Sequence, residues 1–77
     1  MSLAKPLTEV EPGTKVRVVD IVAGRGAMTM LREVGIVPGA ELEVVKTGPG
    51  PVIVRVGGAT FSLGRGLAAK VLVEEVG

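Results

Sequence analysis

The chain has 77 residues, enough for one small domain, which we expect to span residues 1–77. Apolar residues make up 47 % of it, fifteen of them valine and one aromatic, and this composition favours a β-rich fold. Nine basic against eight acidic residues exclude the basic excess typical of nucleic-acid binding. The lack of cysteine excludes disulfides and favours the cytoplasm, and no apolar run approaches the ~20 residues of a membrane-spanning helix.

Two predicted strands each follow a Pro-Gly turn. The dipeptides at 12–13 and 38–39 suit a type II turn, which needs a fixed φ at its second residue and a positive φ at its third. The segments that follow, 14–22 and 41–46, alternate apolar and polar residues as half-buried strands do. The first segment breaks this alternation at Val19, which predicts either a bulge or burial on both faces.

The charges on these two strands are swapped. Lys15 and Arg17 in the first correspond to Glu41 and Glu43 in the second. If the strands are neighbours, opposite charges face each other, with about 0.2–1 kcal/mol for each cross-strand pair. Two strands that only share a turn type would show the same pattern, so pairing is one of two interpretations.

A short helix is predicted between the two strands, after a glycine-rich link at 23–26. Its apolar residues follow the helical spacing i, i+3, i+4 and i+7, at Ala27, Met30, Leu31 and Val34. Gly35 then fits the left-handed position of a Schellman cap, which would bring Ile36 onto Leu31. This pattern places Met30 in the core and leaves Met28 exposed.

The second half of the chain predicts a hairpin. Two prolines make 47–51 a loop, and strands at 52–56 and 59–63 flank Gly57-Gly58, a typical two-residue turn. We expect Ala59, Phe61 and Leu63 to face inward.

One helical turn at 64–70 and a last strand complete the predicted elements, which number five strands and one short helix. Short strands joined by tight turns are typical of a small, partly open barrel. We therefore predict a mostly β, SH3-like barrel with the helix inserted between the first two strands.

The side-chain inventory argues against catalysis and against a resident metal or cofactor. Without His, Cys or Tyr, the usual bases and nucleophile pairs are missing, so we expect no enzyme. Ferrous iron usually takes imidazole together with carboxylate ligands. Some carboxylates could bind a hard cation weakly, but we interpret them as solvent-exposed residues of strands and loops: Glu9, Glu11, Glu41, Glu43, Glu74 and Glu75.

Two further motifs have a binding interpretation. Met28 and Met30 lie two positions apart, on different helix faces, so a shared thioether site for cuprous ion is disfavoured. The sequence GRG at 24–26 and 64–66 precedes helical stretches, where glycines and an arginine can hold an anion. It lacks the Lys and Ser/Thr of a phosphate-binding loop, so we interpret these glycines mainly as hinges.

The order of these signals resembles the ferrous iron transport protein A family from Leu7 to about Glu75. The most specific part is the block "LREVGIVPG", followed at family-like spacing by a Gly-Pro loop, the Gly58 hairpin, Ser62-Leu63 and Ala68. The chain departs from the family pattern at Gly50 and Ala59, which affects the loop rather than membership. The resemblance implies an SH3-like barrel and an accessory role beside the ferrous-iron membrane transporter, ferrous iron transport protein B.

A docking role on the cytosolic region of that transporter is our leading hypothesis. We expect Arg25, Met28, Thr29 and Arg32 to border the contact surface. A peptide-binding SH3 module or a nucleic-acid binder would need aromatic side chains that are missing here. A regulatory domain related to those of metal-dependent repressors is a further alternative, although 77 residues leave no room for a DNA-binding helix pair. Strand edges make a homodimer a further expectation.

Overall fold

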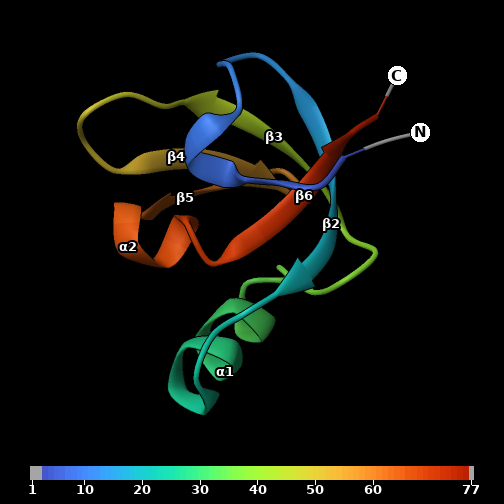
Figure 1. Ribbon diagram of the computed structural model, residues 1–77, viewed down its shortest axis with the longest axis vertical. Coiled ribbons are helices and arrows are strands. Elements are labelled where there is room, and N and C mark those ends of the chain that lie inside the picture. Colours follow the sequence, from blue (N-terminus) through green and yellow to red (C-terminus); the bar gives the residue numbers. More distant parts are fainter. Residues whose placement is uncertain (1–2, 77) are drawn as a thin grey trace.

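The computed structural model describes residues 3–76, which form a six-stranded antiparallel sheet with two helices and a 3₁₀ turn (Figure 1). In chain order the elements are β1 (Lys5–Pro6), η1 (Leu7–Glu9), β2 (Lys15–Ile21), α1 (Arg25–Glu33), β3 (Glu41–Lys46), β4 (Val52–Val56), β5 (Ala59–Leu63), α2 (Arg65–Ala68) and β6 (Val71–Glu75).

The strands are ordered β1-β6-β2-β3-β4-β5, so β1 and β5 lie at the two ends of the sheet. The described strands do not close into a ring, and the predicted partly open, SH3-like architecture with a helix between β2 and β3 is confirmed. The expected number of five strands was one too low. The missed strand β1 has two residues and includes Pro6, so only its pairing with β6 defines it.

The predicted turns and hairpin are confirmed. Gly39 has a φ of +92°, and the N–H of Ala40 donates to the carbonyl oxygen of Val37 across the turn at 2.9 Å. The hairpin joins β4 to β5 through Gly57 and Gly58 alone, both with positive φ. A type I′ turn of this kind matches the twist of its strands.

Strands β2 and β3 are neighbours, as their swapped charges suggested. Lys15 lies opposite Glu43 and Arg17 opposite Glu41 in the register. The register between β2 and β6 shifts after Val18, and Val19 is 44 % exposed. The break in alternation at Val19 is therefore a bulge and not burial on both faces.

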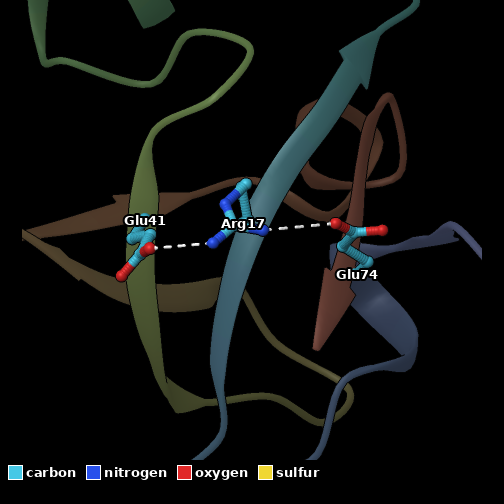
Figure 2. A network of polar contacts seen from close by, with 3 residues as sticks. All are labelled: Arg17, Glu41 and Glu74. Atoms are coloured by element: carbon cyan, nitrogen blue, oxygen red, sulfur yellow. Dashed lines mark hydrogen bonds and ion pairs between the residues drawn. The ribbon is translucent and has the colours of Figure 1, made fainter. Parts of the chain in front are cut away.

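The outer face of the sheet carries ion pairs whose charge sign alternates from strand to strand. Arg17 on β2 lies between Glu41 of β3 and Glu74 of β6, with N–O distances of 3.1 and 3.4 Å (Figure 2). Further pairs join β1 to β6 and β3 to β4: Lys5 with Glu75 at 2.9 Å, and Arg55 with Glu43 at 3.0 Å.

The inner face forms an aliphatic core, and every buried side chain in residues 3–76 is apolar. The fully or nearly fully buried residues come from all the strands except β1, from η1, α1 and α2, and from the segments that follow η1 and α1: Leu7, Val10, Val16, Val18, Ile21, Leu31, Ile36, Leu42, Val44, Val52, Val54, Leu63, Ala68, Val71 and Val73.

The predicted inward face of β5 was only partly right. Leu63 is buried and Phe61 is half-buried, but Ala59 is exposed next to the turn.

The helices of residues 3–76 are all too short to cross a membrane.

Candidate functional site

Helix α1 begins two residues earlier than the apolar pattern suggested. Gly24 is its N-cap and provides no side-chain hydrogen bond. At the other end the N–H of Ile36 donates to the carbonyl of Leu31 at 2.8 Å, and the N–H of Gly35 donates to that of Arg32 at 3.0 Å. With Gly35 at φ +90°, these two bonds are the predicted Schellman cap.

A single residue anchors α1 in the core. Leu31 is fully buried, and it is the only buried residue of this helix. Met28 and Val34 are half-buried and pack against the same core cluster from either side. Figure 1 shows α1 at one end of the long axis, connected to the sheet by the segments that leave β2 and enter β3.

The predicted contact residues lie along one stripe of α1. Arg25, Met28, Thr29 and Arg32 follow the spacing i, i+3, i+4 and i+7, so they share one side of the helix. Arg25, Thr29 and Arg32 are exposed. Neither arginine has a side-chain hydrogen bond or an ion pair within the part of the chain that the structure describes.

The prediction for the two methionines was wrong. Met30 is 47 % exposed, whereas Met28 is half-buried against the core. Met28 lies one turn before the buried Leu31 and on the same side of the helix, whereas Met30 directly precedes Leu31 and lies on another side. We name the four residues Arg25, Met28, Thr29 and Arg32 the basic stripe; Met28 forms its inner border.

An apolar hollow lies on the opposite flank of α1. Met30, Leu31 and Val34 of the helix segment face part of β5 across it, and its volume is about 220 Å³. The β5 residues that line it are Phe61, Ser62 and Leu63. This hollow was not predicted from the sequence, because Met30 and Phe61 were both assigned to the core. The usable signal was Phe61, the one aromatic residue of the chain.

The carboxylates that could hold a hard cation are mostly engaged elsewhere. Glu41, Glu43, Glu74 and Glu75 pair with arginine or lysine side chains. Residues 3–76 contain no group of three or more potential metal-ligating side chains.

The second GRG motif is part of the fold. Its arginine, Arg65, donates to the backbone carbonyl of Gly48 in the 47–51 loop. This contact links α2 to the loop. The first GRG motif instead begins α1 and supplies Arg25 to the basic stripe.

The fold and the site define a small SH3-like domain whose notable surface features gather on one inserted helix. Comparison with known proteins gives the family: residues 5–75 match the FeoA domain model. The chain belongs to the FeoA domain family.

Relatives of known sequence or structure agree with this assignment. A protein of Methanocaldococcus jannaschii, named as a candidate Fe(2+) transport protein A, is 43 % identical over 91 % of this chain and 85 % of its own length. The crystal structure of an iron uptake regulatory protein (FeoA) is 41 % identical, with a TM-score of 0.89 over 96 % of this chain and all of its own. A FeoA-like protein from Clostridium acetobutylicum is 32 % identical, with a TM-score of 0.83 over 99 % of this chain and 91 % of its own.

The same fold occurs in a manganese-dependent transcriptional repressor, at a TM-score of 0.88 and 23 % identity. This chain matches 44 % of that protein's length. At this identity the likeness concerns the fold alone.

Proposed function

We propose that this protein is a non-enzymatic, cytoplasmic accessory domain of ferrous iron transport, and that it docks on the cytosolic region of the ferrous-iron membrane transporter, ferrous iron transport protein B. Membership of the FeoA family supports the pathway. The names of two relatives, a candidate Fe(2+) transport protein A and an iron uptake regulatory protein, point in the same direction.

The docking role rests on the two exposed arginines of α1, Arg25 and Arg32. Most carboxylates of the sheet are paired with basic side chains, whereas Arg25 and Arg32 lie on one exposed stripe without a side-chain partner in residues 3–76. Two arginines about two turns apart, with Thr29 between them, suit an acidic surface on another protein. We therefore assign the basic stripe to the transporter.

The experiment that tests this proposal is direct binding of the purified chain to the purified cytosolic region of the transporter, measured by calorimetry at two salt concentrations. We expect one-to-one binding that weakens as salt rises, because exposed charge pairs are screened. Absence of binding at low salt would refute the docking role, and binding indifferent to salt would refute the basic stripe as its site.

A further inference from the structure

The two ends of the sheet differ in their ability to accept another strand. At one end β1 has two residues, one of them the proline Pro6, which has no N–H to donate, and the other a lysine. At the other end β5 has five residues with neither proline nor charge. Among the six strands of residues 3–76, β5 alone lacks a charged side chain.

The hairpin register identifies the free backbone groups of β5. The two-residue turn makes Val56 and Ala59 a hydrogen-bonded pair, and such pairs alternate along an antiparallel ladder. Thr60 and Ser62 therefore direct their N–H and C=O groups away from β4. No backbone hydrogen bond found outside the regular elements of residues 3–76 uses these groups.

The free edge also borders exposed apolar surface. Ser62 lines the hollow beside α1 together with Phe61 and Met30. Phe61 is half-buried and Met30 is 47 % exposed, so this end of the sheet offers both hydrogen-bonding groups and apolar contact. Strand addition uses this combination.

We propose that β5 pairs with β5 of a second copy of this chain, antiparallel, about a two-fold axis at Phe61. A two-fold contact gathers the same residues of both copies around its axis, so charged side chains on the strand would come close to like charges, and β5 is the strand without one. Because Pro6 and Lys5 protect the β1 end, the assembly stops at two copies.

This register makes definite pairs. Thr60 lies opposite Ser62 of the partner copy in a hydrogen-bonded pair. The two-fold axis repeats this pair, with Ser62 opposite Thr60 of the partner copy, which doubles the number of bonds. Phe61 lies opposite its own counterpart at the closely spaced, non-hydrogen-bonded position, where aromatic pairs are favourable. One five-residue strand forms a contact smaller than the ~1,200–2,000 Å² of stable complexes, so the dimer dissociates on dilution.

Cysteine crosslinking tests the register, because the natural chain has no cysteine. In the proposed dimer the Cα atoms of residue 60 and residue 62 of the partner lie about 5.5 Å apart, within disulfide reach. Residue 62 and its own counterpart lie on a diagonal at about 7–8 Å, beyond easy reach. Both positions are exposed, so Thr60→Cys and Ser62→Cys should leave the fold intact.

We expect a mixture of Thr60→Cys and Ser62→Cys to form the mixed disulfide at least several times faster than either variant forms its own. Equal rates, or faster self-linkage, would overturn the register. Mass spectrometry separates the three products.

Sedimentation of the unmodified chain over a range of concentrations tests the dimer itself. We expect a shift from monomer towards dimer as concentration rises, and its loss in Thr60→Pro, which removes an outward N–H that β4 does not use. A monomer at all concentrations would overturn the proposal and leave the edge to a strand of another protein. Because the basic stripe lies on the other flank of α1, its binding to the transporter is tested independently.

Discussion

Arg17 and Glu41 face each other directly across β2 and β3, and the guanidinium lies 3.1 Å from the carboxylate. The same arginine reaches Glu74 on β6 at 3.4 Å, so one side chain joins three strands (Figure 2). These pairs are partly exposed, and each contributes little alone. Their charged side chains also help to fix the register, because a slip by one residue would turn them towards the core.

We expect Arg17→Glu to lower the free energy of unfolding by about 1 kcal/mol, because it removes two weak pairs and sets three carboxylates side by side. High salt should recover most of the loss, since the Debye length falls to about 3 Å at 1 M. Urea unfolding at low and high salt measures both effects. A loss that is independent of salt would show that the aliphatic stem, and not the charge, stabilises the sheet.

Gly35→Ala tests the cap of α1. The added Cβ would meet only Val56 Cγ1 at 3.5 Å, an ordinary contact, so the cost comes from the positive φ. We expect a loss of about 1–2 kcal/mol in the free energy of unfolding. Gly50→Ala is the matched control, since its φ is not positive and no atom lies near the new Cβ. Similar unfolding curves for the two variants would contradict the cap.

Leu31→Ala and Met30→Ala test how α1 is held. Leu31 is fully buried, so its truncation should cost about 2–5 kcal/mol and loosen the helix. Met30 is 47 % exposed, and we expect Met30→Ala to cost less than about 1 kcal/mol. Thermal unfolding followed by circular dichroism compares the two variants. A larger loss for Met30→Ala than for Leu31→Ala would indicate that Met30 lies in the core, as the sequence pattern predicted.

The features that could be predicted from the sequence are those whose cause is local. Gly35, the Pro-Gly turns and Gly57-Gly58 require particular backbone angles, so residue type alone indicates them. The β2–β3 pairing is not local, but complementary charges on the two strands suggested it as one of two interpretations.

The features that were missed depend on tertiary contacts. Residues 5–6 form a strand only because β6 lies beside them. The exchange of Met28 and Met30 depends on which side of α1 faces the sheet, and the apolar spacing alone assigned that side wrongly. The apolar hollow was missed because of the same error, since the exposed Met30 is one of the residues that line it. The four residues of the basic stripe were predicted as helix residues that need not be buried, and three of them are exposed, but their role in binding stays a prediction.

Binding of the transporter's cytosolic region to the chain with Arg25→Glu, compared with Lys46→Glu, is the measurement that tests the docking role most directly. Arg25 lies in the first turn of α1, where an acidic side chain interacts favourably with the helix dipole, so the variant should stay folded. Lys46 is an exposed residue of β3, and its reversal makes the same change in net charge. Met28→Asp is the less clean choice, because Met28 packs against the core. We predict that Arg25→Glu weakens binding by about tenfold or more while Lys46→Glu leaves it within about twofold. Equal affinity of both variants and the unmodified chain would contradict docking through the basic stripe.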